Sequence, residues 1–364
     1  MAVWKSALEN LVVNPTFWQD KRVVLTGHTG FKGGWMSVWL AQMGAKVFGF
    51  SLEPRTKPSF FEVVSVEDQL SGHEIGDLLN YNALSDFVSA SRPDIVFHMA
   101  AQALVRRAYF EPLETISTNV LGTANLLQAC RGVKSLKSIV NVTSDKCYHN
   151  DELGRAFVES DRMGGRDVYS ASKGAVELIS HAFGQCFFKN GHIALANARA
   201  GNVFGGGDWS EDRLVPDYLR ATEKNAPLVI RSPNAVRPWQ HVLEPLSGYL
   251  ILAQKLFENG DKFSGGWNFG PTQNSVKTVQ WLVDYLIQAN GGEAVYENTK
   301  QPKEAHYLTL DSGKSAAALG WTPKWAVEKA LDNTISWERA RLIGANMLDV
   351  TTSQIEEYQF SEVS

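Results

Sequence analysis

The chain has 364 residues, a length typical of two domains of about 150 residues each. Its formal net charge of -4 argues against nucleic acid or an anionic membrane as a partner, and no apolar run approaches the roughly 20 residues of a spanning helix. Three scattered cysteines argue against a disulfide framework, and the N-terminal residues lack the pattern of a signal peptide. We therefore expect a soluble cytoplasmic protein.

Up to residue 205 the chain alternates between short β-branched apolar runs and longer amphipathic segments. This alternation predicts βαβ units and a buried parallel sheet, so the expected fold class is α/β. We expect strands at Arg22–Thr26, Lys46–Phe50, Asp94–His98, Ser138–Val142 and Ile193–Asn197.

A glycine-rich turn follows the first expected strand. Gly27, Gly30 and Gly33 stand between this strand and an expected helix over residues 35–43. Glycines in such a turn let a dinucleotide pyrophosphate approach the backbone and the helix N-terminus. The spacing Gly-x-x-Gly-x-x-Gly differs from the pattern of many dehydrogenases, and an ordinary glycine turn is the alternative.

The end of the second expected strand leaves the choice of cofactor open. Many NAD enzymes place an acidic residue there to bind the adenosine ribose. Ser51 stands near that position, Glu53 follows two residues later, and Arg55 is suited to a 2′-phosphate. The residues alone therefore do not decide between NAD and NADP.

The stretch from Val142 to Lys173 carries the strongest catalytic signal. Tyr169 and Lys173 are four positions apart, so on a helix they share one face. A nearby ammonium stabilises phenolate, and we expect Lys173 to lower the pKa of Tyr169 towards neutrality. Ser144, Asp145 and Lys146 add a hydroxyl, a carboxyl and a second amine at the end of an expected strand.

The alternating sequence pattern ends at Gly205, where a Gly-Gly-Gly-Asp run precedes segments interrupted by prolines. This predicts a smaller, less regular region, while the run 266–271 is typical of a strand that returns to the sheet. We expect a dinucleotide-binding Rossmann domain over residues 1–205 and a mainly substrate-binding domain over residues 206–364, the two being interleaved.

Together these pieces resemble the extended short-chain dehydrogenase/reductase family, and within it most of all the CDP-glucose 4,6-dehydratases. The narrower likeness rests on Gly27-His-Thr-Gly-Phe-Lys-Gly33 and Thr143-Ser-Asp-Lys-Cys-Tyr148. Further family-like strings stand in order: Gly76-Asp-Leu78, His98-Met-Ala-Ala-Gln102, Thr118-Asn-Val-Leu-Gly-Thr123, Arg199-Ala-Gly-Asn-Val-Phe-Gly205, Arg237-Pro-Trp-Gln-His-Val242 and Leu319-Gly-Trp-Thr-Pro323.

The resemblance implies a doubly wound sheet with a smaller C-terminal nucleotide-sugar domain, and it favours NAD. The activity implied is the dehydration of CDP-glucose to CDP-4-keto-6-deoxyglucose, a step in deoxysugar synthesis for lipopolysaccharide O-antigen and other surface polysaccharides. The implied cofactor contacts are Gly27, Thr29, Gly30, Phe31, Lys32, Gly33, Ser51, Asp77, Leu78, Ala100, Ala101, Tyr169 and Lys173.

The implied catalytic roles fall on five residues. Tyr169 removes the O4 proton, and Lys173 lowers its pKa and binds the nicotinamide ribose. Ser144 bonds O4, Asp145 is the acid for the C6 hydroxyl, and Lys146 occupies the place of a glutamate base. The substrate contacts are Ser144, Asn202 and Arg237, and no metal is implied.

Simpler roles compete with these assignments. Asp145 is also placed to cap a turn, Lys146 to be a solvated charge, and Arg237 to form a surface ion pair. A nucleotide-sugar 4-epimerase is the nearest rival activity, since it needs the Tyr/Lys pair but no elimination pair. Another nucleotide hexose is also open as substrate. The family pattern further implies a homodimer, or a dimer of dimers, through helices at residues 112–131 and 168–189.

Overall fold

The computed structural model describes residues 13–150, 152, 154–189, 191–297 and 307–361. Its centre is a seven-stranded sheet in the order β11-β6-β5-β4-β1-β2-β3, in which every neighbouring pair is parallel. The strands are β1 (Arg22–Thr26), β2 (Lys46–Ser51), β3 (Gly72–Ile75), β4 (Ile95–His98), β5 (Ser138–Val142), β6 (Ala194–Arg199) and β11 (Gly265–Asn268). The predicted α/β fold class with a parallel sheet is confirmed.

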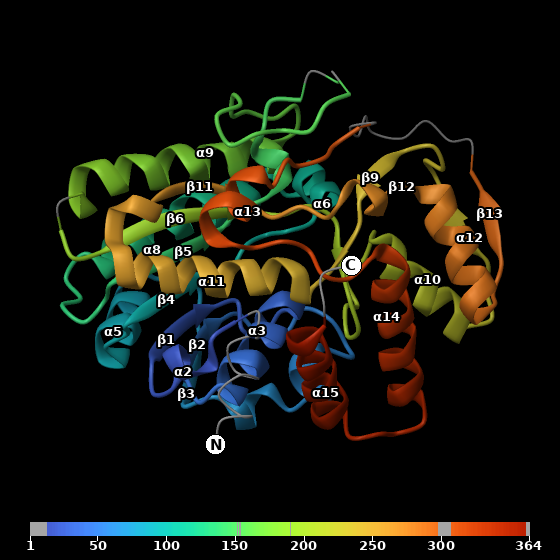
Figure 1. The fold of residues 1–364 in the computed structure, drawn as a ribbon, viewed down its shortest axis with the longest axis horizontal. Coiled ribbons are helices and arrows are strands. Elements are labelled where there is room, and N and C mark those ends of the chain that lie inside the picture. Colours follow the sequence, from blue (N-terminus) through green and yellow to red (C-terminus); the bar gives the residue numbers. More distant parts are fainter. Residues whose placement is uncertain (1–12, 151, 153, 190, 298–306, 362–364) are drawn as a thin grey trace.

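Helices cover both faces of the sheet, which makes it doubly wound (Figure 1). On one face the apolar sides of α3 (Phe31–Gln42) and α11 (Leu243–Asn259) form the larger core. On the other face lie α5 (Tyr81–Ser91), α8 (Gly122–Cys130) and α9 (Val168–Phe183), which is continued by a π-turn at Gly184–Phe188. Burial on both faces explains why the central strands read as continuous apolar runs.

Two elements differ from expectation. The edge strand β3 was not predicted, because its sequence Gly-His-Glu-Ile has neither an apolar run nor a buried residue. Helix α3 begins at Phe31, four residues before the expected start, because Gly30 serves as its N-cap and Gly33 and Gly34 are inside its first turns. The phosphate loop is therefore shorter than the sequence suggests.

The chain leaves the carboxyl end of β6 and builds a second group of elements with its own apolar core. Its helices are α10 (Leu214–Glu223), α12 (Val279–Asn290) and α14 (Val327–Leu342). Three two-stranded sheets accompany them, formed by β7 (Val203–Phe204) with β10 (Gln240–His241), β9 (Val236–Pro238) with β12 (Val276–Thr278), and β8 (Leu228–Ile230) with β13 (Ala294–Tyr296).

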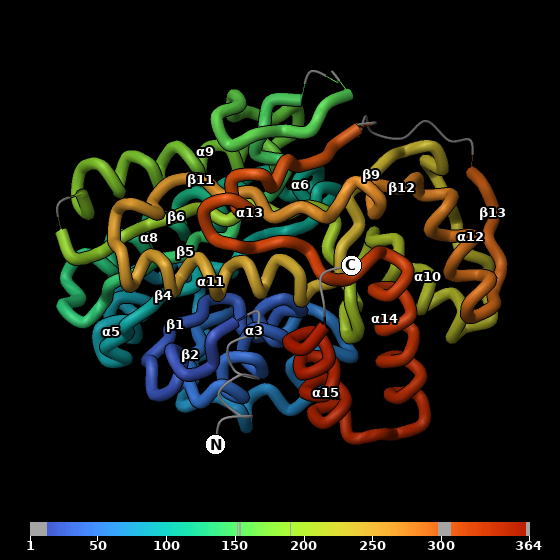
Figure 2. The backbone as a smooth tube through the Cα atoms, in the orientation of Figure 1, coloured from blue at the N-terminus to red at the C-terminus, as the bar shows by residue number. Residues whose placement is uncertain are grey.

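The chain crosses between the two groups more than once. Strand β11 pairs with β6 in parallel, so the chain returns to the large sheet after residue 205. Helix α13 (Gly313–Leu319) packs beside it, and α15 (Met347–Phe360) lies against α3, as Figure 2 shows. The proposed domain limits at residue 205 stay a prediction.

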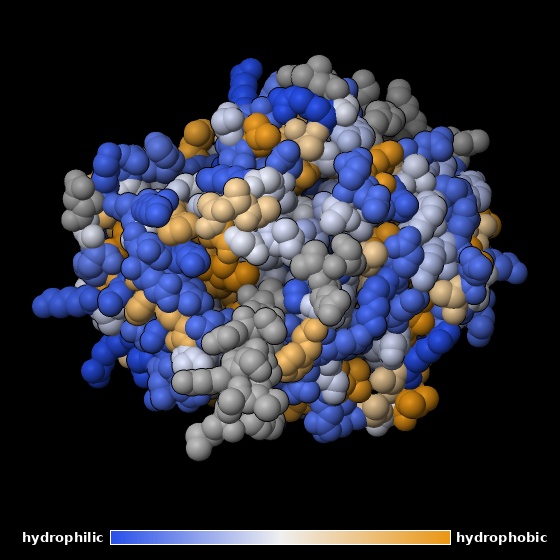
Figure 3. Space-filling view, in the orientation of Figure 1, coloured by the Kyte–Doolittle hydropathy of each residue, from blue (hydrophilic) through white to orange (hydrophobic). Residues whose placement is uncertain are grey.

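The remaining helices are short and border the sheet. They are α2 (Pro15–Trp18), α4 (Phe60–Val63), α6 (Val105–Phe110) and α7 (Pro112–Ile116), with 3-10 or π turns at Val66–Gln69, Ser117–Leu121, Asp145–Cys147, Gly260–Phe263 and Gln273–Ser275. No helix in the described part of the chain is long and apolar enough to cross a membrane. Hydrophilic residues cover most of the face in Figure 3, with apolar residues in small groups.

Candidate active site

The glycine loop is shaped by close backbone contacts. Gly27 has a φ of 82°, in the region that favours glycine, and a Cβ there would lie 2.7 Å from the amide nitrogen of Ala100. A Cβ on Gly33 would lie 2.1 Å from the carbonyl oxygen of Gly27. The loop therefore brings the N-terminus of α3 close to the end of β1, which fits a bound pyrophosphate.

The ends of β1, β2 and β4 meet around this loop. The hydroxyls of Thr29 and Ser51 are 2.8 Å apart, and Thr29 also donates to the carbonyl of Leu52 at 2.8 Å. Ala100 stands two residues after the end of β4, and Ala101 comes next. The structure thus brings Thr29, Ser51 and the two alanines together at one edge of the sheet, where the cofactor residues are expected.

Asp77 and Leu78 follow β3 at the far side of the same edge. Asp77 is exposed and its Oδ1 accepts a hydrogen bond from the backbone of Leu79 at 2.9 Å, while Leu78 is buried against Gly122. The carboxylate of Asp77 therefore stabilises its own turn.

Phe31 and Lys32 begin α3, and Lys32 reaches towards the catalytic segment. Its Nζ lies 5.8 Å from the ring centre of Tyr249, on α11. Burial lowers the pKa of Lys32 to about 7; the charges of Arg213 and Lys173 act in the same direction, and those of Asp145 and Asp208 oppose it. Lys32 was expected only as a cofactor contact, but its charge also interacts with those of the catalytic residues Lys173 and Asp145.

Tyr169 and Lys173 lie on the inner face of α9, as their spacing predicts, and both are buried. Burial raises the pKa of Tyr169 to about 12, although a hydrogen bond with Ser144 lowers it. The expectation that Lys173 brings this pKa towards neutrality is wrong for the protein alone. Burial disfavours the phenolate of Tyr169 and also the ammonium of Lys173. It therefore lowers the pKa of Lys173 to about 8.

Ser144, Asp145 and Lys146 follow β5 and form a 3-10 turn opposite α9. The Ser144 hydroxyl donates to Oδ1 of Asp145 at 2.9 Å and accepts from the backbone of Lys146 at 3.2 Å, so Ser144 caps this turn. The Lys146 Nζ lies 3.6 Å from Asp145 Oδ1, with 31% of its side chain exposed.

Asp145 is the buried centre of this group, with 1% of its surface exposed. Its Oδ2 has no hydrogen-bond partner among the described residues, and a Cβ on Gly201 would come within 2.6 Å of it. A buried carboxylate oxygen without a donor is costly unless a ligand satisfies it. This is the property expected of a group that meets a substrate hydroxyl, and it is not that of a helix or turn cap.

Asn202 and Arg237 approach from the second group of elements. Oδ1 of Asn202 is buried without a recorded partner among the described residues. Arg237, on β9, is buried, with 7% of its surface exposed. Its neighbour Pro238 contacts Gly201, which places this strand beside Asp145.

Arg213 and Asp208 were missed by the sequence reasoning. They form an ion pair at 3.2 Å, with Asp208 buried and Arg213 partly buried just before α10. The charge of Arg213 lowers the pKa values of both Tyr169 and Lys32, so it faces the same site. The only signal in the sequence was an arginine after a glycine run, and nothing there linked it to Tyr169.

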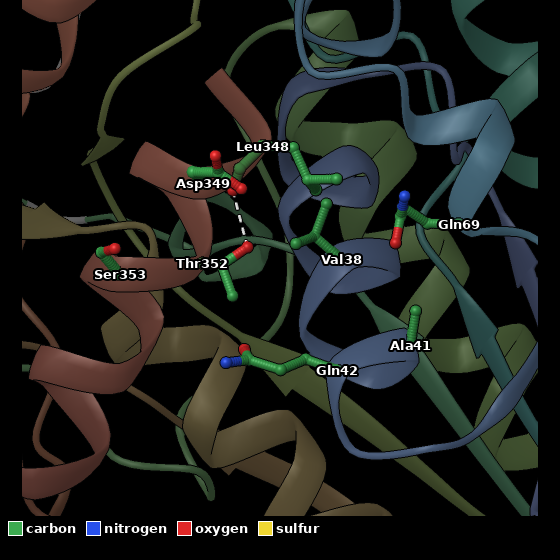
Figure 4. A pocket seen from close by; sticks show the side chains of 8 residues that line it. All are labelled: Val38, Ala41, Gln42, Gln69, Leu348, Asp349, Thr352 and Ser353. Carbon is green, nitrogen blue, oxygen red and sulfur yellow. Dashed lines mark hydrogen bonds between the residues drawn. The ribbon is translucent and has the colours of Figure 1, made fainter. Parts of the chain in front are cut away.

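A separate hollow of about 420 Å³ lies between α3 and α15, away from these groups (Figure 4). None of the expected site residues lines it. Its lining residues are Val38, Ala41, Gln42, Gln69, Leu348, Asp349, Thr352 and Ser353. In the described residues no group of three or more acidic, histidine or cysteine side chains is arranged to hold a metal ion.

Comparison with known proteins agrees with this geometry. The family described as GDP-mannose 4,6 dehydratase matches residues 24–334. The CDP-glucose 4,6-dehydratase of Salmonella typhimurium is 47% identical over 354 residues, covering 95% of this chain and 98% of the relative.

Two solved structures share the fold at lower identity. The NAD complex of the dTDP-glucose 4,6-dehydratase from Bacillus anthracis has a TM-score of 0.74 and 20% identity, covering 90% of this chain and 99% of that one. The UDP-glucose 4-epimerase of Thermotoga maritima, with UDP-glucose, has a TM-score of 0.76 and 22% identity, covering 88% and 99%. From its sequence match, its sheet and its Tyr169–Lys173 pair, the chain belongs to the GDP-mannose 4,6-dehydratase family, within the extended short-chain dehydrogenases/reductases.

Proposed function

We propose that this protein is a hydro-lyase that converts CDP-glucose into CDP-4-keto-6-deoxyglucose with NAD as cofactor. The observation that carries the proposal is the buried Asp145 between Ser144 and Lys146, set opposite Tyr169 and Lys173. The similarity to the Salmonella enzyme supports the choice of CDP-glucose, because the described residues alone do not select a base. The product is a precursor of deoxysugars for surface polysaccharides.

In this proposal each residue has one task. Tyr169, as a phenolate that the ammonium of Lys173 stabilises, accepts the O4 proton and becomes a neutral phenol. Ser144, whose hydrogen bond already lowers the pKa of Tyr169, holds the O4 oxygen. Lys146 removes the C5 proton, and Asp145 gives a proton to the departing C6 hydroxyl. The chemistry supplied by bound NAD is reversible hydride transfer.

The proposal also assigns contacts to the cofactor and to the substrate. The proposed cofactor contacts are Gly27, Thr29, Gly30, Phe31, Lys32, Gly33, Ser51, Asp77, Leu78, Ala100, Ala101, Tyr169 and Lys173. Ser144, Asn202 and Arg237 contact the nucleotide sugar, and Arg213 joins them. Arginine suits a diphosphate because its guanidinium donates in a planar fork.

The assembly we propose is a cytoplasmic homodimer, alone or as half of a tetramer. Its support is an exposed apolar patch on α6, α7 and α9, which lie side by side. Phe110 is 79% exposed, Leu113 77% and Leu178 64%. Adjacent exposed apolar side chains of this size mark an interaction surface.

The test is turnover of four nucleotide sugars. Purified protein with added NAD is incubated with CDP-, dTDP-, GDP- and UDP-glucose, and products are followed by mass spectrometry and by the absorbance of the 4-keto sugar in alkali. We expect loss of one water from CDP-glucose and little reaction with the others. Tyr169→Phe is the inactive control.

Two outcomes would contradict the proposal. Equal or faster turnover of dTDP-glucose would reject CDP-glucose as the substrate. A product with unchanged mass but the galacto configuration would instead support the 4-epimerase.

A further inference from the structure

Glu177 lies on the face of α9 that carries Tyr169 and Lys173. Tyr169, Lys173 and Glu177 are spaced by four residues, so they lie on one face of the helix, and all three are buried. The proposed function employs the first two and leaves Glu177 without a task. A buried carboxylate is expensive unless it is paired and fully hydrogen-bonded, so its partners indicate what it holds in place.

Those partners come from the two strands next to α9. Oε1 of Glu177 accepts hydrogen bonds from the Thr143 hydroxyl at 2.6 Å and from Nε of Arg199 at 2.9 Å. Oε2 accepts from Nδ2 of Asn197 at 2.8 Å and from Nη2 of Arg199 at 2.8 Å. Thr143 directly precedes Ser144, so one carboxylate joins the helix of Tyr169 to the start of the Ser144–Lys146 segment.

Arg199 extends the connection to the other end of that segment. Its Nη1 donates to the Tyr148 hydroxyl at 2.6 Å, and Tyr148 donates to Oδ1 of Asn268 on β11 at 2.7 Å. Tyr148 immediately follows the turn Asp145–Cys147. The Glu177–Arg199 pair therefore holds the residues on both sides of the proposed acid and base.

Glu177 also acts on the charge of Lys173, one turn away. Burial lowers the pKa of Lys173 to about 8, and Cys147 and Glu177 oppose this fall. The charge of Lys173 in turn adds to the effect of burial in lowering the pKa values of His98 on β4 and of Lys32 on α3. If the Glu177 carboxylate is removed, burial lowers the pKa of Lys173 further, because one of the charges that raise this pKa is lost.

We propose that Glu177 is a positioning residue that places a negative charge one helical turn from Lys173 and, with Arg199, holds Ser144, Asp145 and Lys146 opposite Tyr169. The expected effect of Glu177 on catalysis rests on the proposed function. The electrostatic part of the role concerns only Lys173 and is open to measurement without a substrate.

Three variants separate charge from geometry. Glu177→Gln removes the charge and keeps the size of the side chain. Thr143→Val keeps the charge of Glu177 and removes one hydrogen bond to the segment. Glu177→Met/Arg199→Met removes both partners of the buried pair, which protects folding because neither charge is left alone.

The first measurement is NAD affinity by calorimetry between about pH 6 and about pH 10, across the range in which Lys173 titrates. Lys32, another proposed cofactor contact, titrates lower, at about 7, so the weakening of binding at higher pH, near about 8, reports the loss of the proton from Lys173. We expect the midpoint of that loss to move down by about one pH unit in Glu177→Gln, to move down by less in the double variant, which also loses the opposing charge of Arg199, and to stay in place in Thr143→Val.

The second measurement is steady-state dehydration of CDP-glucose. We expect Thr143→Val to lower kcat between about tenfold and a hundredfold with little change in KM, since a small displacement of reacting groups has effects of this size. Unchanged pH midpoints in folded Glu177→Gln and the double variant, or a Thr143→Val variant that loses only thermal stability, would overturn the proposal. If the wild type does not dehydrate CDP-glucose, the proposed function fails, while the calorimetric comparison still decides the role of Glu177.

Discussion

Lys146 is the residue on which the proposed elimination depends most. It occupies the place where the family resemblance puts a glutamate base, and it lies 3.6 Å from the buried Asp145. An ammonium cannot accept a proton, so this lysine must be neutral when it removes the C5 hydrogen.

Replacing Lys146 with alanine tests this role. We expect Lys146→Ala to slow dehydration by about a hundredfold to ten-thousandfold, the usual contribution of a general base, while transient NAD reduction persists. The measurements are product formation, cofactor absorbance in single turnovers, and deuterium exchange at C5. Lys146→Glu should recover part of the rate. Wild-type exchange at C5 in Lys146→Ala would mean that the base is a different residue.

The lowered pKa of Lys32 makes the free energy of unfolding depend on pH. Its pKa is about 7 in the folded protein against a model-peptide value of 10.5, so between these values the unfolded chain binds more protons than the folded one. Stability of the protein without NAD therefore rises with pH across that window. The burial penalty is greatest below about pH 7, where the folded protein must keep a charged amine.

Lys32→Met removes this penalty while keeping a long side chain. We expect the variant to be more stable than the wild type near pH 6, and the difference to shrink towards pH 10. Urea unfolding at both ends of this range measures it, with the exposed Lys134→Met as the control. A difference that is constant with pH would show that Lys32 is not a strained charge.

At the scale of elements, the loop between β1 and α3 is limited by backbone contacts. A Cβ on Gly33 would meet the carbonyl of Gly27 at 2.1 Å, whereas a Cβ on Gly30 would meet it at an ordinary 3.4 Å. Backbone atoms cannot move aside without displacing the whole loop. The two glycines therefore differ in their tolerance of alanine although the motif contains both.

Gly33→Ala should weaken NAD binding by at least about tenfold, because loss of even one charge-assisted hydrogen bond to the pyrophosphate costs about 1.5–3 kcal/mol. Gly30→Ala should bind NAD nearly as well as the wild type. Calorimetric titration of both variants checks this. Equal affinities in the two would show that the loop adjusts without losing its contacts to the cofactor.

The predicted elements succeeded where a local pattern was present. The strands at Arg22–Thr26 and Ser138–Val142 have the predicted limits because each is a continuous apolar run between polar segments. Edge strand β3 has no such run, since it is exposed, and its position depends on pairing with β2. Local sequence carries no information on that pairing.

At the scale of the whole molecule, the proposed dimer depends on the patch on α6, α7 and α9. A charge in the middle of an apolar interface would be buried without a partner, which association cannot compensate. Leu113→Glu should therefore give monomers at concentrations where the wild type is dimeric. Sedimentation velocity measures this, with Ile343→Glu as the control because Ile343 is 84% exposed at the distant end of α14.

The opposite result is equally informative. If Leu113→Glu keeps the mass of the wild type while Ile343→Glu becomes smaller, the interface lies at α14 and the patch on α9 serves another purpose. If the wild type is a monomer, self-association does not explain the exposed apolar patch on α6, α7 and α9.

The sequence by itself determined the parallel sheet, the glycine loop and the shared face of Tyr169 and Lys173. These depend on apolar periodicity and on residues a few positions apart. The tertiary structure decided which charges share the site. It buried Asp145, brought Lys32 and Arg213 to it from distant segments, and tied Glu177 to Arg199.

It also decided the sign of the pKa shift of Tyr169. The spacing Tyr-x-x-x-Lys predicts a neighbouring ammonium, but it carries no information on how much water is excluded. In the folded protein the loss of water is the larger effect, so the pKa rises to about 12. Desolvation comes from segments far apart in the chain, which is why no local pattern predicts it.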